Sequence, residues 1–119
     1  MRRALLPIVA CLLLGAATFH LSLRSSSPGK DETVAAPLTR VSLTFSGTVN
    51  AKLSAVSILS PDSTEVARVP VVAGPKPTML VGHLPRRLPG GRYLVRWRTA
   101  GADGHAVRGA YAFTINPVE

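Results

Sequence analysis

This chain of 119 residues has little of several things that larger or more specialised proteins contain. Cys11 is the single cysteine, so the chain cannot close a disulfide within itself. Aromatic residues make up 5% of the sequence, and methionine occurs twice. Acidic side chains number 6 against 14 Lys and Arg, a formal net charge of +8. The length allows one domain and not two, which excludes a multidomain enzyme, and the lone cysteine excludes a disulfide-stapled miniprotein.

Long apolar runs are missing after residue 19, which excludes a polytopic membrane protein. The N-terminal segment itself has the order of a secretory signal peptide: Arg2 and Arg3, then the uncharged residues 4–19, with small residues near the end. A membrane-spanning helix needs roughly 20 apolar residues, so cleavage is favoured over a retained anchor. We predict a signal peptide over residues 1–19, an exported domain over residues 20–119, and a periplasmic or extracellular location.

The processing of this segment stays open among three forms. Cleavage after Phe19 makes His20 the first residue, although Phe is a poor residue before a cleavage site, whereas cleavage after Ala17 makes Thr18 the first. The small residue before Cys11 also has the form of a lipidation box. Contact with a membrane is expected only if the N-terminus stays uncleaved or is lipidated.

The positive charge of residues 20–119 comes from 12 Lys and Arg against 6 Asp and Glu, a net charge of +6. These basic residues are scattered along the sequence. No predicted helix carries them, and no aromatic residues alternate with them as a stacking platform. We therefore expect no nucleic-acid partner and interpret the charge as a solvated surface.

Apolar residues after the signal segment alternate with a period of two, as they do in β-strands. The alternation is clearest over residues 41–45, 93–98 and 111–115; shorter apolar runs cover 53–59, 66–72 and 78–81, and residues 21–25 are a candidate first strand. No segment has a 3.6-residue period longer than two turns. About seven short strands separated by Pro- and Gly-rich turns predict an all-β Greek-key sandwich.

Trp97 is expected in the core of this sandwich, because it shares one face of its predicted strand with Tyr93 and Val95. The turn Pro89-Gly90-Gly91 before Tyr93 resembles the turn that precedes a tyrosine corner.

Catalytic signatures are also lacking: no Gly-x-Ser-x-Gly elbow and no glycine-rich phosphate loop before a helix are present. The notable cluster is Asp103-Gly104-His105, whose carboxylate and imidazole would point to one side of an extended segment and share a divalent metal ion. His20 as the first residue would add its ring and its α-amine. A nitrogen-rich set with one carboxylate suits Cu(II). The same residues also fit an ordinary Asp-Gly turn followed by a solvated histidine.

Four collinear motifs in residues 20–116 resemble the CopC family of periplasmic copper-resistance proteins. The motifs are His20-Leu-Ser-Leu-Arg-Ser-Ser-Ser-Pro28, Val41-Ser-Leu-Thr-Phe-Ser46, Arg92-Tyr-Leu-Val-Arg-Trp-Arg98, and Ala102-Asp-Gly-His105 followed by Gly109-Ala-Tyr-Ala-Phe113. They match the family's mature start, its "LTFS" strand, its "YxVxWR" strand and its "ADGHPxxGxxxF" end.

The resemblance implies an immunoglobulin-like or cupredoxin-like sandwich that binds one Cu(II) ion in copper resistance or homeostasis. It implies three ligands: His20 through its amine and ring, Asp103 and His105. It also implies a CopD-type membrane protein as a partner.

The chain departs from the family pattern at several positions. Gly47 replaces a frequent Glu, and Ala106 replaces the usual Pro after the Asp-Gly-His motif. Met79 is the one methionine in residues 20–119, so we expect no thioether site for Cu(I). His83 matches no ligand of the family and is expected on a surface loop.

The leading hypothesis is a non-enzymatic Cu(II) carrier or buffer. One alternative is a small copper monooxygenase, which would also use an N-terminal histidine, although short loops and few aromatic residues disfavour it. The other alternative is a structural immunoglobulin-like module that binds no metal.

Overall fold

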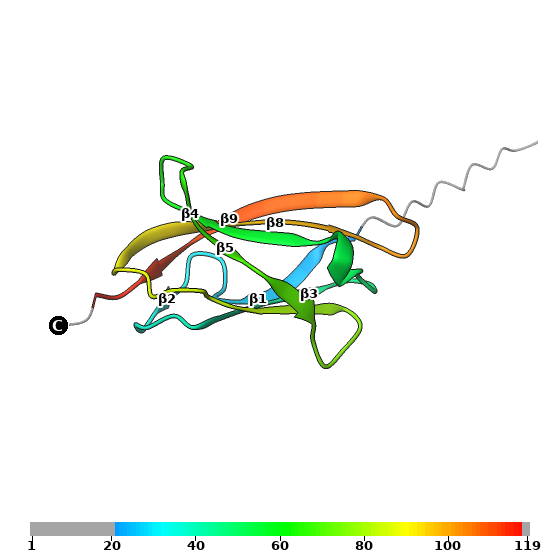
Figure 1. The fold of residues 1–119 in the computed structure, drawn as a ribbon, viewed down its shortest axis with the longest axis horizontal. Coiled ribbons are helices and arrows are strands. Elements are labelled where there is room, and N and C mark those ends of the chain that lie inside the picture. Colours follow the sequence, from blue (N-terminus) through cyan, green and yellow to red (C-terminus); the bar gives the residue numbers. More distant parts are fainter. Residues whose placement is uncertain (1–20, 118–119) are drawn as a thin grey trace, which may run out of the picture.

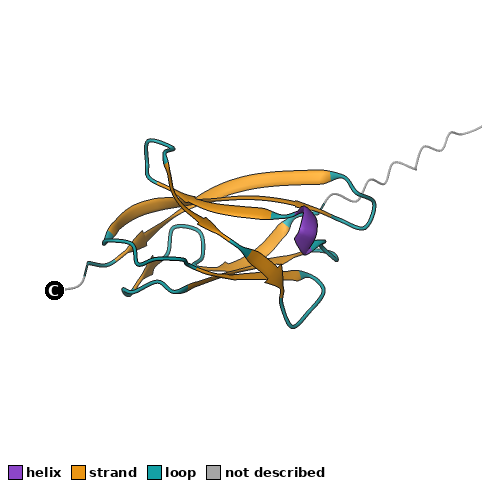
Figure 2. Cartoon of the chain, in the orientation of Figure 1, coloured by secondary structure: helices purple, strands orange, loops and turns teal. Residues whose placement is uncertain are grey.

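The computed structural model describes residues 21–117, which form two β-sheets packed face to face (Figure 1). One sheet has four strands in the order β1-β3-β7-β6, and the other has five in the order β2-β9-β8-β4-β5. The strands are β1 (Leu23–Ser27), β2 (Thr33–Val34), β3 (Arg40–Phe45), β4 (Ala55–Leu59), β5 (Glu65–Val69), β6 (Val71–Ala73), β7 (Met79–His83), β8 (Gly91–Ala100) and β9 (Ala106–Ile115). A short 3₁₀ turn, η2 (Ala51–Leu53), precedes β4 (Figure 2). The predicted all-β sandwich is confirmed.

The chain passes repeatedly from one sheet to the other. The crossing between β5 and β6 is the one that the sequence pattern does not predict. The apolar run over residues 66–72 suggested one strand, but it forms two strands in different sheets. Pro70 lies between them, and a proline cannot donate a backbone hydrogen bond to continue the ladder. Because of this division and the two-residue β2, the described residues contain nine strands and not about seven.

Two further differences concern β2 and the start of β4. The parallel pairing of β2 with β9, Thr33 with Thr114 and Val34 with Ile115, has no signal in the sequence because it is a long-range contact of two residues. The first residue of the apolar run over 53–59 belongs to η2, where the Asn50 side chain accepts a 2.9 Å hydrogen bond from the backbone N–H of Lys52.

The core lies between the sheets and is made by the alternating residues of β3, β4, β8 and β9. Trp97 is 8% exposed, and its ring packs edge-on against Phe45 with the ring centroids 5.2 Å apart. Across the β8–β9 ladder Trp97 pairs with Gly109, and a Cβ atom at Gly109 would lie 2.5 Å from the indole. The predicted core position of Trp97 is confirmed.

Two tyrosine hydroxyls tie strands to turns. Tyr93 donates a 2.6 Å hydrogen bond to the carbonyl of Pro89, four residues earlier, which is the contact expected of a tyrosine corner. Tyr111 donates a 2.7 Å hydrogen bond to the carbonyl of Pro28, so this bond connects β9 to the turn that follows β1.

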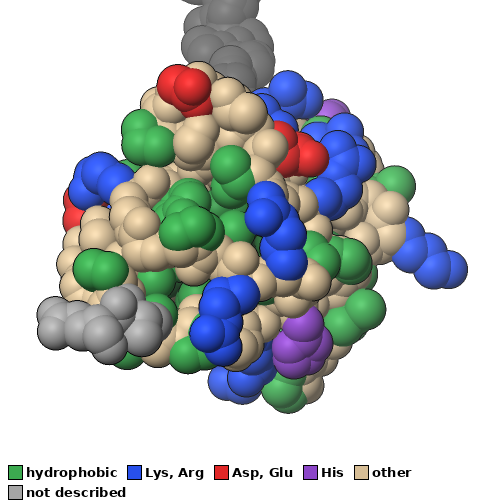
Figure 3. All heavy atoms as spheres, turned by 60° about the vertical axis from the view of Figure 1, so that its left-hand side comes forward, with side chains coloured by type: hydrophobic (Ala, Val, Ile, Leu, Met, Phe, Trp, Pro, Cys, Tyr) green, Lys and Arg blue, Asp and Glu red, His purple; other side chains and the backbone are tan. Residues whose placement is uncertain are grey.

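The surface is basic, in keeping with the excess of Lys and Arg in the sequence. Figure 3 shows Lys and Arg side chains distributed over one side of the molecule, with acidic side chains at few places between them. Within residues 21–117, no helix has the length and apolar character needed to cross a membrane.

Candidate metal centre

The candidate ligands Asp103 and His105 lie in the loop that joins the two longest strands. The β8–β9 ladder runs from Gly91 opposite Ile115 to Ala100 opposite Ala106, and residues 101–105 close the hairpin. The N–H of Gly104 donates a 2.9 Å hydrogen bond to the carbonyl of Gly101. Gly104 has φ +81°, a conformation that glycine adopts without steric cost.

This turn brings the carboxylate and the imidazole together. Asp103 Oδ1 accepts a hydrogen bond from the backbone N–H of His105 at 2.9 Å, and Asp103 Oδ2 lies 2.9 Å from His105 Nδ1. The sequence-based argument assumed an extended segment, which is wrong for Gly104. A tight turn held by the Asp103 side chain, and not strand alternation, is the reason that the two side chains meet.

Each side chain shifts the pKa of the other. The hydrogen bond from His105 holds the pKa of the Asp103 carboxyl below its ordinary value, and the same hydrogen bond from Asp103 raises the pKa of the His105 ring. In the neutral ring, Nδ1–H donates to Asp103, which leaves the lone pair of Nε2 available to a metal ion. The His105 and Asp103 side chains are 86% and 62% exposed, so a metal ion in solution can reach them.

The third expected ligand, His20, lies outside the described residues, which begin at Leu21, the residue that follows it in the chain. Leu21 packs beside the hairpin loop, because a Cβ atom at Gly101 would lie 3.1 Å from Leu21 Cδ1 and 3.7 Å from Asp103 Oδ1. The next residue, Ser22, exchanges two hydrogen bonds with Ser46: its N–H donates to the Ser46 hydroxyl at 3.0 Å, and its carbonyl accepts from the Ser46 N–H at 2.9 Å. The start of β1 and the β8–β9 loop therefore share one end of the sandwich (Figure 1).

Comparison with known proteins assigns this architecture. A family model described as the CopC domain matches residues 23–116, which is most of the chain. The chain belongs to the CopC family. Copper resistance protein C of Escherichia coli is 35% identical over 104 residues, covering 81% of each chain. This finding confirms the resemblance noted in the sequence.

Solved structures of the CopC family have the same fold. The crystal structure of CopC from Methylosinus trichosporium OB3b superposes with a TM-score of 0.77 at 36% identity, covering 84% of this chain and 97% of the other. PcoC from Escherichia coli, described as a methionine-rich copper resistance protein, gives a TM-score of 0.71 at 31% identity, covering 82% of this chain and all of its own.

The described residues of this CopC-family chain bring together two candidate ligands and no more. Within residues 21–117, no group of three or more His, Cys, Asp and Glu side chains is close enough to hold a metal ion. Gly47 contributes no carboxylate, and the Leu21 side chain packs beside it, because a Cβ atom at Gly47 would lie 3.2 Å from Leu21 Cδ2. Asp103 and His105 are therefore the two candidate ligands that the described residues bring together.

His83 is far from this pair along the sandwich. It ends β7 opposite Arg40, whereas the other end of β3, at Phe45, pairs with Leu23 at the start of β1, two residues after the Leu21 that packs beside the hairpin loop. The expected loop position of His83 is wrong, since it is the last residue of a strand, but the residue is exposed as expected.

Four residues that position the candidate site were missed in the sequence: Leu21, Ser22, Ser46 and Gly101. Their contacts join segments 24 to 80 positions apart in the chain, and no local pattern of residue types signals such contacts.

Proposed function

We propose that this chain is an exported copper-binding protein that holds one Cu(II) ion at the β8–β9 end of the sandwich. Residues 1–19 act as a signal peptide, and the domain of residues 20–119 works in the periplasm or outside the cell. The ligands are His20, through its α-amine and ring, together with Asp103 and His105.

The observation that carries this proposal is the position of Leu21 beside the Asp103–His105 loop. Leu21 directly follows His20 in the sequence, and its side chain lies against the loop that carries Asp103 and His105. Leu21 and Asp103 both lie next to Gly101. The first described residue is therefore close to the loop of the candidate ligands Asp103 and His105. A third ligand from His20 would complete a site that the described residues leave incomplete.

The donor set favours Cu(II) over Cu(I). Imidazole, amine and carboxylate donors suit the tetragonal sites of Cu(II), whereas thioether ligands select Cu(I). Met79 is the one methionine within residues 21–117, and it lies half-buried in β7. The copper resistance proteins among its relatives support copper as the metal.

Exposure of the candidate ligands favours a carrier or buffer over an enzyme. The 86% exposure of the His105 side chain leaves it open to an incoming chelator or partner protein, which suits release of the ion as well as capture. Copper held in this way would pass to, or be withheld from, a membrane protein of the CopD type.

Two forms of the protein test the proposal directly. One begins at His20, and the other carries a single additional Ala before His20, which converts the α-amine to an amide. Titration with Cu(II) against a competing chelator should give tight 1:1 binding for the first form and a large loss of affinity for the second. Equal affinity of the two forms would contradict the role of the amine and favour Thr18 as the natural first residue.

Substitutions in the loop test the other two ligands. His105→Ala and Asp103→Asn should each weaken Cu(II) binding, while His83→Ala, at the far end of the sandwich, should leave it unchanged. A Cu(I) titration under reducing conditions completes the test, because Cu(I) affinity as high as that for Cu(II) would overturn the choice of oxidation state.

A further inference from the structure

Arginines from three strands lie together on the outer face of the five-stranded sheet, although they are scattered in the sequence. We call this surface the arginine face; its members are Arg68 of β5, Arg92, Arg96 and Arg98 of β8, and Arg108 of β9. Alternation is the cause, because Tyr93, Val95 and Trp97 point into the core and the residues between them point outward.

The register of the sheet makes these arginines neighbours. Arg98 lies directly opposite Arg108, and Ser57 of β4 lies opposite both Arg68 and Arg96. Side chains directly opposite each other on neighbouring strands have Cβ atoms about 5 Å apart. The positive charges are therefore concentrated on a small area of a rigid sheet.

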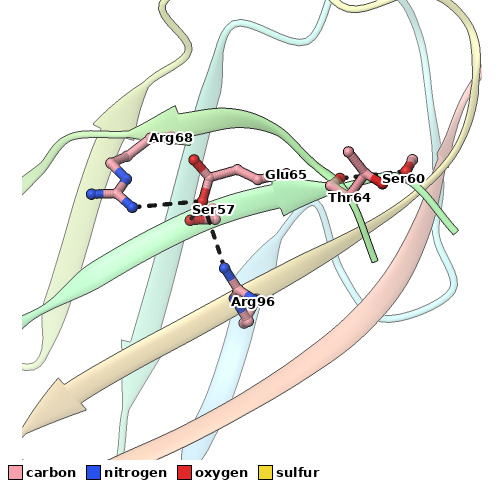
Figure 4. Close-up of polar contacts among 6 residues, drawn as sticks. All are labelled: Ser57, Ser60, Thr64, Glu65, Arg68 and Arg96. Atoms are coloured by element: carbon pink, nitrogen blue, oxygen red, sulfur yellow. Dashed lines mark hydrogen bonds and ion pairs between the residues drawn. The ribbon is translucent and has the colours of Figure 1, made fainter. Parts of the chain in front are cut away.

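Acidic residues neutralise only part of this charge. Glu65 Oε1 lies 3.7 Å from Arg68 Nη2 and 3.6 Å from Arg96 Nη2, and it accepts a 3.0 Å hydrogen bond from Ser57 (Figure 4). Arg92 lies 3.5 Å from Asp31 at the edge of the face.

The pair formed by Arg98 and Arg108 has no such partner. Among the described residues, no carboxylate lies within 4 Å of either side chain. Like charges directly opposite each other on a sheet are destabilising. An external anion at this position would relieve the repulsion.

The opposite side of the sandwich is different. The four-stranded sheet carries two exposed arginines, Arg24 of β1 and Arg40 of β3, and the outward positions of β3 and β7 are otherwise uncharged or apolar, together with His83. Within residues 21–117, the strands of the five-stranded sheet carry five arginines and those of the four-stranded sheet carry two, so the strand arginines are concentrated on one sheet.

We propose that the arginine face binds the anionic headgroups of a phospholipid membrane. Guanidinium groups form paired hydrogen bonds with phosphate oxygens, and a sheet presents several of them toward one extended surface. Clustered basic side chains near an anionic bilayer contribute about 1 kcal/mol each to binding.

A membrane fits this face better than a protein partner does. Protein interfaces depend on aromatic and other apolar anchors, but the five described aromatic side chains are all in the core. Between the arginines lie small residues such as Ser57 and Ala110. Binding should therefore be electrostatic and reversible, without insertion into the apolar part of the bilayer.

Membrane docking would also place the candidate metal centre. The Arg98–Arg108 pair is two residues from Ala100 and Ala106, where the ladder ends and the Asp103–His105 loop begins. That separation is about 7 Å along the strands. A docked molecule would hold its copper loop close to the bilayer; this consequence rests on the proposed function, whereas the docking itself does not.

The test uses the copper-free protein that starts at residue 20, because residues 21–117 contain both complete sheets. Co-sedimentation with vesicles should show binding to phosphatidylcholine mixed with phosphatidylglycerol, no binding to phosphatidylcholine alone, and release at high salt. The combined change Arg96→Gln, Arg98→Gln and Arg108→Gln should weaken the partition about 100-fold.

A matched control separates the arginine face from net charge. Arg40→Gln, Lys76→Gln and Arg87→Gln remove the same charge from exposed positions elsewhere and should weaken the partition only a few-fold. Equal losses in the two triple variants would overturn the proposal, as would binding to an acidic peptide without binding to anionic vesicles.

A single-substitution variant and a Cu(II) titration complete the test. If the triple variant does not fold, Arg108→Gln alone should still weaken the partition about 5-fold, and an unchanged partition would overturn the proposal. Cu(II) titration of the same proteins should be unaffected by the arginine substitutions. If the unaltered protein binds anionic vesicles but does not bind copper, the proposed function is overturned and this inference is not.

Discussion

At the scale of single residues, Asp103 has two roles that a turn of five residues allows it to combine. Its carboxylate closes the turn through the backbone N–H of His105 and also holds the ring of the same residue. A carboxylate that holds a metal-binding imidazole fixes its orientation and increases its basicity. In the proposed copper site, the turn would therefore hold the His105 ring in position before the ion binds.

Replacement of Asp103 should be visible in the copper-free protein. Because the Asp103 hydrogen bond raises the pKa of His105, Asp103→Asn should lower the pKa of that ring toward its ordinary value. An NMR titration of the His105 ring protons in the parent protein and in the variant measures the change. An unaltered His105 pKa in the variant would mean that the two side chains do not interact in solution.

Copper affinity should depend on pH through the same residue. A raised pKa means that protons occupy the His105 ring up to a higher pH than in an isolated histidine, so Cu(II) affinity should fall as the pH falls through that value. Competition titrations at a series of pH values measure this dependence. A flat profile across the titration range of His105 would exclude its ring as a ligand.

Trp97 is a large core side chain that contacts both sheets. Its ring contacts Phe45 and covers the bare backbone of Gly109 on the neighbouring strand. Trp97→Ala should lower the free energy of unfolding by about 3–5 kcal/mol, as other truncations of large core side chains do. Denaturation monitored by far-ultraviolet circular dichroism measures it, and a loss below about 1 kcal/mol would contradict the core position.

At the scale of elements, the passage from β5 to β6 is the point at which prediction from sequence fails most clearly. Pro70 marks the division, yet only the packing shows that the two strands then belong to different sheets. Gly82 of β7 makes this corner fit, since a Cβ atom there would lie 2.5 Å from the Pro70 carbonyl oxygen and 2.7 Å from Val69 Cγ1.

Gly82→Ala should therefore be destabilising by about 1–3 kcal/mol, because backbone at the corner would have to move. Gly29→Ala is the matched control, since its nearest neighbour, Glu32 Oε1, lies at an ordinary 3.4 Å. Chemical denaturation of the two variants beside the parent protein gives the comparison. Equal stability of the two variants would show that the corner has more room than its geometry indicates.

At the scale of the whole molecule, a domain of about 100 residues without a disulfide depends on its core and on any ligand that it binds. An ion that binds only the folded state adds stability according to its concentration relative to Kd, about 2.7 kcal/mol at 100 times Kd. Both the proposed copper site and the arginine face belong to this scale, because each is assembled from distant segments.

Cu(II) should accordingly raise the thermal unfolding midpoint of the protein that starts at His20, and a chelator should reverse the rise. The form with an additional Ala before His20 should show a smaller rise at the same copper concentration, while the two copper-free midpoints should be equal. Scanning calorimetry makes the comparison. A copper-induced rise of the same size in both forms would argue against the amine as a ligand.

Reading the sequence alone is enough to predict the fold class, the core positions and the candidate pair Asp103 and His105. These features depend on local patterns: a period of two places Tyr93, Val95 and Trp97 in the core, and a short turn joins the two candidate ligands. In contrast, the folded chain is needed to see that Leu21 lies beside that turn and that Arg68, Arg96 and Arg108 share one face. The physical reason is that sheet register and the packing of the two sheets bring together residues tens of positions apart, and neither is written in any local stretch of the chain.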